Sequence, residues 1–266
     1  MQAPQATDGF DERLRQRMAS PSPRPLETIP KDPALRPDGR IPNTPLAAST
    51  ISFLLGGTFA LGGLTFLIGG FDDVWWATPQ LCFYVAAWSF FHWAEFAVTA
   101  GWNPEKCSVG SFLLENGALY HIAHSVAVLE YLLTLYFKPS IKEHPNISTF
   151  GVTLAVAGQI LRSLAMINAG SNFSHIVAYR KLNTHVLVTS GIYAWLRHPS
   201  YTGFFYWALG LQLVLQNPVS FAIFVAVLWR FFYHRIKGEE ISLVRFFGND
   251  YVQYRNRVGT WIPFIR

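Results

Sequence analysis

Arg162 lies inside a long apolar run, Ile147 to Ala169, where a charged side chain is costly. A guanidinium in such a place pairs with a carboxylate or a phosphate, because its planar fork matches their oxygen atoms. Two interpretations stay open and are compatible. The partner is either an anionic group of a bound substrate or a glutamate of the chain itself, namely Glu95, Glu115 or Glu130.

A second group of polar residues follows this run. Its members lie in Ala169–His175, Leu187–Tyr193, Arg197–Gly203, Arg235–Glu240 and Phe247–Tyr251. The pair Asn217-Pro218 predicts a tight helical hairpin, because proline starts a helix but cannot continue one. Both ends of a hairpin meet on one side, so Arg197–Gly203 should lie near Glu239 and Glu240. This arrangement predicts a pocket for a polar ligand beside apolar walls.

The histidines inside apolar runs predict packing rather than metal binding. His121 and His124 share a helix face, as do His92 and Glu95, but no further ligands follow at a recognisable spacing. We therefore expect these histidines to form hydrogen bonds within the bundle, and we expect no metal site. A Gly-x-Gly-x-x-Gly turn after a strand is also missing from the sequence. Any nucleotide-like ligand must therefore bind between helices.

The composition predicts a membrane protein that positions these residues on helices. Hydrophobic residues make up 51% of the chain and charged residues 14%, against about 25% charged in soluble domains. Runs near the length of a membrane span, about 20 residues, recur along the chain. They are Leu46–Gly70, Trp75–Gly101, Phe112–Phe137, Ile147–Ala169, Tyr201–Gln216 and Pro218–Tyr233. The predicted fold class is all-α, a polytopic membrane bundle of about six spans with a C-terminal helical hairpin.

Three regions follow from this pattern. Residues 1–45, rich in Pro, Arg, Asp and Ser, are expected to form a disordered cytosolic tail without a signal peptide. Residues 46–169 should form four spans, and residues 170–266 a cytosol-facing module that contains the hairpin. In the first span, small residues at Gly56, Ala60, Gly63 and Gly70 predict close packing within the bundle in preference to dimerisation.

Basic residues set the orientation. The front tail holds seven of them, and the residues after the hairpin hold six more, whereas the opposite side has Lys138 and Lys142. The positive-inside rule then places both termini in the cytosol. Orientation explains the net charge of +5, together with attraction to the lipid bilayer, so the charge implies no nucleic-acid partner.

The motif Arg197-His-Pro-x-Tyr-x-Gly203, followed by the hairpin and Glu239-Glu240, resembles a module of membrane methyltransferases. Isoprenylcysteine carboxyl methyltransferases and phospholipid methyltransferases share it. Three segments are similar to the isoprenylcysteine family in particular: Leu161–Met166, Ala169–His175 and the ending Phe247–Ile265. The resemblance covers the chain from Leu46 onward, and the six-span count fits the fungal form of that family better than the animal form.

The resemblance implies a function and a set of roles. It implies methyl esterification of the C-terminal prenylated cysteine of CaaX-processed proteins at the endoplasmic reticulum membrane, with S-adenosylmethionine as methyl donor and S-adenosylhomocysteine as product. His198, Tyr201, Glu239 and Glu240 would hold the donor's polar ends. Further donor-site residues would be His175, Leu187, Val188, Gly191, Ile192 and Tyr193. Arg162 would orient the acceptor carboxylate, and Asn172 would assist as an uncharged hydrogen-bond donor. The acceptor's prenyl chain would enter from the lipid, with Trp88–Trp102 as a wall.

Three alternatives stay open at this stage. A phospholipid N-methyltransferase would need a base for its amine acceptor, which the Arg162 and Asn172 segment suits less well than it suits a carboxylate. A sterol reductase would need a basic site for NADPH, to which Arg180-Lys181 would contribute weakly. A non-enzymatic membrane protein explains the buried charges but leaves the cluster of His198, Tyr201 and Glu239-Glu240 unexplained.

Overall fold

The computed structural model describes residues 41–265, apart from residues 72, 177–180 and 182–184. The regular structure within these ranges is entirely helical, which confirms the predicted all-α fold. The helices are α2 (Pro45–Leu67), α3 (Pro79–Trp102), α4 (Ala118–Phe137), α5 (Pro145–Ala169), α6 (Pro199–Val214), α7 (Pro218–Phe247) and α8 (Asn249–Arg257), with short 3-10 turns between them. The tail predicted to be disordered lies, up to residue 40, outside the described residues.

Proline marks the beginning of most of the long helices. α2, α3, α5, α6 and α7 each have proline in the first turn, where its missing N–H costs no hydrogen bond. Threonine side chains cap two of them: Thr44 Oγ1 accepts from Ala47 N at 3.2 Å, and Thr78 Oγ1 accepts from Leu81 N at 3.3 Å. These local signals fix where the chain enters each helix.

Among the described residues, five helices, α2 to α5 and α7, are long and apolar enough to cross a membrane. The predicted fifth span differs from them. α6 has 16 residues, so at 1.5 Å per residue it extends about 24 Å, short of the ~30 Å hydrocarbon core. It is nevertheless buried along most of its length. α7 also continues past the predicted end at Tyr233 to Phe247, because the polar residues that follow are compatible with a helix outside the lipid.

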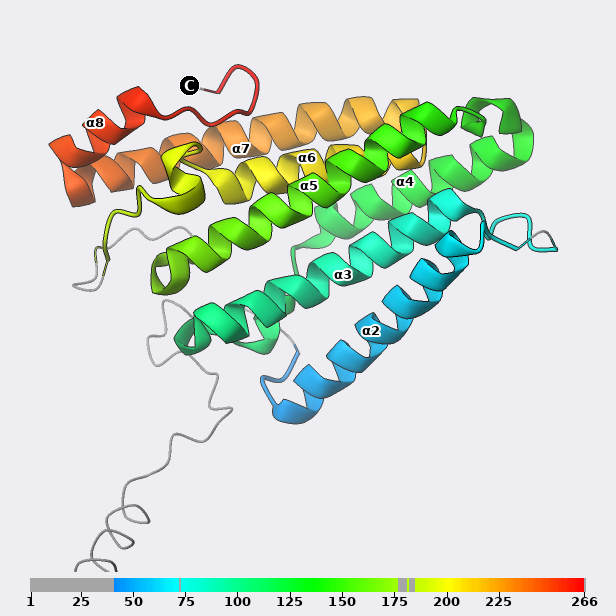
Figure 1. Cartoon of the computed structure of the whole chain (residues 1–266), viewed down its shortest axis with the longest axis horizontal. Coiled ribbons are helices and arrows are strands. Elements are labelled where there is room, and N and C mark those ends of the chain that lie inside the picture. Colours follow the sequence, from blue (N-terminus) through cyan, green and yellow to red (C-terminus); the bar gives the residue numbers. More distant parts are fainter. Residues whose placement is uncertain (1–40, 72, 177–180, 182–184, 266) are drawn as a thin grey trace, which may run out of the picture.

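The predicted hairpin is confirmed, and α6 and α7 run side by side (Figure 1). Its turn is held from outside by Lys142, whose Nζ donates to Leu215 O at 2.9 Å, Gln216 O at 2.9 Å and Asn217 Oδ1 at 2.8 Å. Burial lowers the pKa of Lys142 to about 8. The ends of the hairpin at Pro199 and Phe247 consequently lie on the opposite side from this turn.

α5 and α6 touch backbone to backbone. A Cβ added at Gly158 would come within 2.5 Å of Trp207 N, and one at Gly203 within 2.7 Å of Arg162 N. Gly151 and Gly210 make the same kind of contact one to two turns further along. Small residues allow such approach in lipid. The contact brings Arg162 of α5 against the beginning of α6.

α2 lies at the edge of the bundle against α3 (Figure 1). The predicted packing face is only partly right. A Cβ at Gly70 would meet Ala77 O at 2.6 Å, but a Cβ at Gly56 or Gly63 would meet no atom within 4 Å. Gly62 makes the close contact instead, because a Cβ there would lie 2.8 Å from Cys82 O. The sequence pattern thus identified a small-residue helix but selected a neighbouring face.

Candidate functional site

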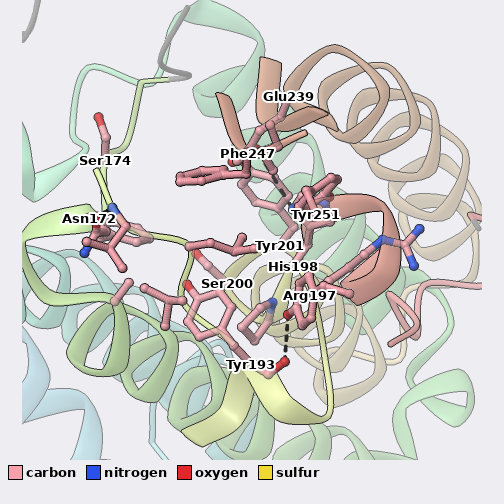
Figure 2. Close-up of a pocket in the computed structure, with 18 residues that line it drawn as sticks. Asn172, Ser174, Tyr193, Arg197, His198, Ser200, Tyr201, Glu239, Phe247 and Tyr251 are labelled. Atoms are coloured by element: carbon pink, nitrogen blue, oxygen red, sulfur yellow. Dashed lines mark hydrogen bonds and ion pairs between the residues drawn. The ribbon is translucent and has the colours of Figure 1, made fainter. Parts of the chain in front are cut away.

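A polar cavity opens where the α6–α7 hairpin, the segment before α6 and α8 come together (Figure 2). The lining residues are Ala169, Asn172, Phe173, Ser174, Val186, Leu187, Val188, Tyr193, Arg197, His198, Pro199, Ser200, Tyr201, Glu239, Leu243, Phe247, Tyr251 and Tyr254. The predicted pocket at the cytosolic end of the hairpin thus corresponds to a cavity.

Glu239 supplies the acidic wall of this cavity. Its Oε2 accepts a hydrogen bond from the Tyr201 hydroxyl at 2.5 Å and lies 4.0 Å from His198 Nδ1. The His198 and Tyr201 rings stack with centroids 5.5 Å apart. The spacing of three residues at the beginning of α6 places both rings on one face, opposite the carboxylate from α7. These three predicted residues therefore meet.

Glu240 faces away from the cavity, although the sequence prediction grouped it with Glu239. Its Oε1 accepts from Arg197 Nε at 2.6 Å and lies 3.3 Å from His198 Nε2, and Arg255 Nη1 is 3.7 Å from Oε2. Neighbouring residues on a helix point about 100° apart, so the two glutamates cannot share one role. Glu240 holds the residues that line the cavity and does not line it itself.

Tyrosines close the far side. Tyr254 donates its hydroxyl proton to Tyr193 O at 2.7 Å, which joins α8 to the turn before α6 (Figure 2). Burial raises the pKa of Tyr193, Tyr251 and Tyr254 above the ordinary value of a tyrosine. The three hydroxyls are therefore neutral near pH 7, and they can donate hydrogen bonds.

The segment before α6 provides both lining and support. Leu187 and Val188 line the cavity. Asn172 lines it too, although the sequence analysis placed it at the acceptor, and its Oδ1 accepts from Val186 N at 2.8 Å. Gly191 and Ile192 are not among the lining residues. They form a turn held by Asn168, whose Oδ1 accepts from Ile192 N at 2.8 Å, and Gly191 has a φ of +60° that favours glycine. This turn sets the position of Tyr193.

A larger, apolar cavity lies next to the polar one. Its walls come from α4, α6 and α7 and include Leu119, Ala123, Phe204, Ala208, Ile223, Phe224, Val227, Leu228, Phe231 and Phe232. No described residue of Trp88–Trp102 lines it, so the predicted wall is wrong for this cavity. Four residues, Phe173, Ser174, Ser200 and Tyr201, line both cavities. The two spaces thus share a wall.

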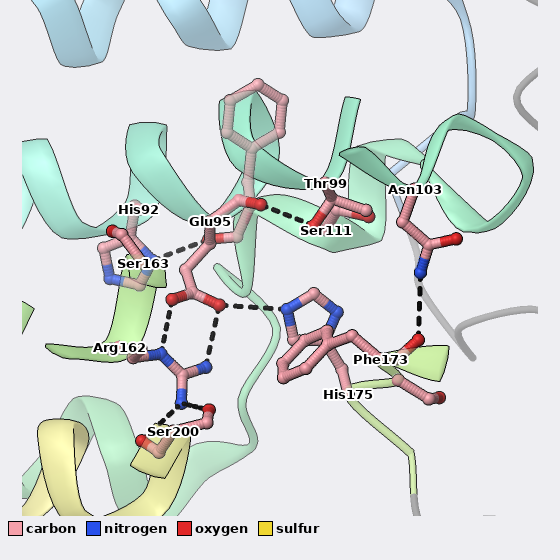
Figure 3. Close-up of polar contacts among 12 residues, drawn as sticks. His92, Glu95, Thr99, Asn103, Ser111, Arg162, Ser163, Phe173, His175 and Ser200 are labelled. Carbon is pink, nitrogen blue, oxygen red and sulfur yellow. Dashed lines mark hydrogen bonds and ion pairs between the residues drawn. The ribbon is translucent and has the colours of Figure 1, made fainter. Parts of the chain in front are cut away.

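Arg162 lies at the polar end of the apolar cavity and pairs with Glu95 (Figure 3). Its Nε and Nη2 donate to the two carboxylate oxygens, the latter at 2.7 Å. Its Nη1 donates to Ser200 Oγ at 3.0 Å. The internal ion pair is therefore confirmed, with Glu95 as partner. Glu130 serves elsewhere, since it accepts from Val219 N at 3.0 Å and Ser220 N at 2.7 Å.

His175 belongs to this group and not to the polar cavity. Its Nε2 lies 2.9 Å from Glu95 Oε2, and its side chain lines the apolar cavity (Figure 3). The sequence prediction assigned His175 to the donor site. The structure places it on the other side of the shared wall, because α3 supplies a carboxylate there.

The three histidines that were predicted to pack inside the bundle do form hydrogen bonds. His92 Nδ1 lies 2.7 Å from Phe112 O, His121 Nε2 lies 2.7 Å from Leu114 O, and His124 Nδ1 lies 2.6 Å from the Tyr84 hydroxyl. No group of three or more potential metal ligands occurs among the described residues.

Arg235 is a functional candidate to which the sequence analysis gave no role of its own, although Arg235–Glu240 was among the polar segments. Its Nε donates to the Tyr201 hydroxyl at 3.0 Å and its Nη2 to His175 O at 2.6 Å. It lines the apolar cavity, and it has no carboxylate partner among the described residues. One signal was visible: Arg235 stands four residues before Glu239, so both occupy one face of a helix.

Residues 151–245 match the profile of the isoprenylcysteine carboxyl methyltransferase (ICMT) family. The protein-S-isoprenylcysteine O-methyltransferase of Saccharomyces cerevisiae is 46% identical over 70% of this chain and 83% of its own length. That of Schizosaccharomyces pombe is 42% identical over 84% of this chain and 98% of its own. This chain belongs to the ICMT family.

This chain covers a smaller share of the length of some other family members. The rat protein-S-isoprenylcysteine O-methyltransferase is 45% identical over 69% of this chain, which spans 64% of that relative's length. A solved structure described as the eukaryotic intramembrane Ras methyltransferase ICMT has 37% identity and a TM-score of 0.77. The match extends over 82% of this chain and 77% of the chain in the solved structure. Fold and family of this ICMT member are therefore shared with a protein of known structure.

Proposed function

We propose that this chain transfers a methyl group from S-adenosylmethionine to the C-terminal carboxylate of prenylated cysteine in CaaX-processed proteins. The observation that carries the proposal is the wall shared by the polar and the apolar cavity at Ser200 and Tyr201. A polar donor and a lipid-like acceptor need two spaces of opposite character that meet at one point. The names of the related proteins support the same reaction.

The polar cavity suits the methyl donor. The Glu239 carboxylate complements the donor's positively charged groups, whereas His198 and the Tyr251 hydroxyl can donate to its carboxylate. Leu187 and Val188 add an apolar surface and backbone polar groups that can contact the adenine ring of the methyl donor. The bound donor supplies a methyl group that its sulfonium charge has already activated.

The apolar cavity suits the prenyl chain of the acceptor. Aliphatic and phenylalanine side chains, with two alanines among them, form most of its wall, and polar groups gather where it meets the donor cavity. Arg235 is the cation at that end without a carboxylate partner among the described residues. It is therefore the side chain that faces the acceptor carboxylate, while Arg162 orients that end of the cavity through Ser200.

The reaction requires little more than position. A carboxylate is already ionised at pH 7, so no general base is needed. The chain gains rate by holding the two reactants in line and by removing water from the carboxylate. Asn172 lines the cavity proposed for the methyl donor. Its side-chain oxygen accepts a hydrogen bond from Val186 N, so its amide N–H groups remain as uncharged hydrogen-bond donors.

Cellular placement follows as part of the same proposal. The chain would lie in the endoplasmic reticulum membrane with both termini in the cytosol, where the donor is dissolved. Its partners would be prenylated protein C-termini and the bilayer, without nucleic acid.

Membranes containing the full chain test the proposal with labelled S-adenosylmethionine. The two acceptors offered are N-acetyl-farnesylcysteine and phosphatidylethanolamine. We expect base-labile label on the cysteine compound, because a carboxyl methyl ester hydrolyses in alkali. Label on the phospholipid alone would establish an N-methyltransferase and reject the proposal.

A further inference from the structure

Six residues form a closed ring of contacts at the polar end of the apolar cavity, and we call them the polar collar. They are Glu95, Arg162, His175, Ser200, Tyr201 and Arg235. Glu95 contacts Arg162 and His175, His175 O accepts from Arg235 at 2.6 Å, and Arg235 donates to Tyr201 at 3.0 Å. Arg162 completes the ring through Ser200, the chain neighbour of Tyr201.

Glu95 differs from the other five members. Arg162, His175, Ser200, Tyr201 and Arg235 all line the apolar cavity, whereas Glu95 lies behind them and is 1% exposed. Figure 3 shows its carboxylate between Arg162 on one side and His175 on the other. It therefore cannot touch a bound acceptor, but it fixes the two residues through which Ser200 and Arg235 are held.

The charges of the collar are unequal. Glu95 neutralises Arg162 by two hydrogen bonds, one to each carboxylate oxygen. Arg235 bonds only to a hydroxyl and a carbonyl among the described residues, so its charge is left for the acceptor. A carboxylate held by two arginines would be a poorer nucleophile than one held by a single arginine, because each ion pair stabilises its negative charge.

We propose that Glu95 is a positioning residue that keeps Arg162 away from the acceptor carboxylate. It thereby leaves Arg235 as the single cation that orients the carboxylate. This inference rests on the proposed function. It assigns to the Arg162–Glu95 pair a part in turnover, in addition to its part in holding α3 against α5.

Glu95→Gln tests the proposal because it removes the charge that occupies Arg162 and keeps the shape. The dissociation constants of a farnesylcysteine carboxylate and its carboxamide are measured on the purified full chain, together with donor affinity and kcat. Because Arg162 is freed, we expect the variant to prefer the carboxylate over the carboxamide by at least the same ratio of dissociation constants as the wild type. The kcat should fall by roughly tenfold to a hundredfold, and donor affinity should be unchanged.

The double variant Glu95→Met/Arg162→Met separates this role from structural support. Replacing both members of a buried ion pair with apolar residues is often tolerated, so the variant should fold. Without a free Arg162 to trap the acceptor, its kcat should exceed that of Glu95→Gln. Glu130→Gln is the matched control, since Glu130 lines neither cavity and its carboxylate accepts from the backbone N–H groups of Val219 and Ser220 in α7. Its kinetics should equal those of the wild type.

The possible outcomes are distinct. Unchanged kcat in Glu95→Gln overturns the inference, as does an equal weakening of donor, carboxylate and carboxamide binding, which would show general damage. A double variant slower than the single variant also overturns it. A wild-type chain that binds no farnesylcysteine carboxylate would instead refute the proposed function, and the collar inference with it.

Discussion

The two sides of the helical bundle are held together by different means. α5 and α6 meet with their backbones in contact, and Arg162 emerges from that seam to meet Glu95 and Ser200. α2 instead lies at the edge with most of its surface exposed, and a Cβ added at Gly56, Gly57 or Gly63 would meet no atom within 4 Å. The difference teaches that a glycine in a membrane helix indicates a close contact only where a partner's backbone lies opposite.

The largest effect should follow a change in the α5–α6 seam. Gly158→Leu would force a side chain into Trp207 N and Gly203 O, which lie 2.5 and 2.6 Å from a Cβ at that position. Overpacking can cost more than a few kcal/mol where the neighbouring atoms cannot shift, and the backbone atoms that face Gly158 cannot move aside as side chains do, so we expect a larger loss of stability than from any other change. We expect little folded protein, measured by the yield of monodisperse protein after purification. Normal yield and activity would show that the seam can open without loss.

Arg162→Ala should rank second. The change leaves Glu95 buried without its cation, and breaking a buried pair in this way costs about 3–5 kcal/mol. We expect turnover to be abolished while donor binding largely persists, because Arg162 does not line the donor cavity. Isothermal titration with the donor checks the second part. Loss of donor binding in a folded variant would move Arg162 into the donor site.

Glu240→Gln should have a smaller effect that is confined to the donor cavity. Glu240 holds Arg197 and His198 from behind, so a neutral side chain should loosen both. We expect donor affinity to fall by roughly tenfold, which corresponds to about 1.4 kcal/mol. Asp250→Asn, the same charge change at an exposed position of α8, serves as control. Equal donor affinity in the wild type and Glu240→Gln would remove Glu240 from the site.

The smallest effect should distinguish two neighbouring glycines of α2. Gly62→Ala places a Cβ 2.8 Å from Cys82 O and should destabilise the α2–α3 contact by about 1–3 kcal/mol. Gly63→Ala meets no atom within 4 Å and should be neutral or stabilise by up to about 1 kcal/mol. Thermal unfolding of the two variants in one detergent measures the difference. A reversed order would mean that α2 packs through another face.

The sequence predicted the parts of the fold that depend on local signals. Long apolar runs located the long helices, and Asn217-Pro218 located the hairpin. The end of α7 was placed too early, because the switch from apolar to charged residues at Arg235 marks the membrane surface and not the end of a helix.

The site was predictable where spacing along one helix determines direction. His198 and Tyr201 met Glu239 as expected. Glu240 and His175 were grouped with them because they are close in the chain or in the motif. Glu240 points in another direction around its helix and contacts Arg197, and His175 contacts the Glu95 carboxylate of α3. Arg235 was missed because its charge had another explanation in membrane orientation.

The wall formed by Ser200 and Tyr201 has a consequence for inhibitors. A compound with a charged head on one side of this wall and a hydrocarbon tail on the other would place its head in the polar cavity and its tail in the apolar one. Such a compound also partitions between water and the membrane before it binds. Its potency would depend on how much of it dissolves in the membrane, so a dose stated per volume of buffer would mislead. Two laboratories using different amounts of lipid would then report different values for the same compound, and both would be correct.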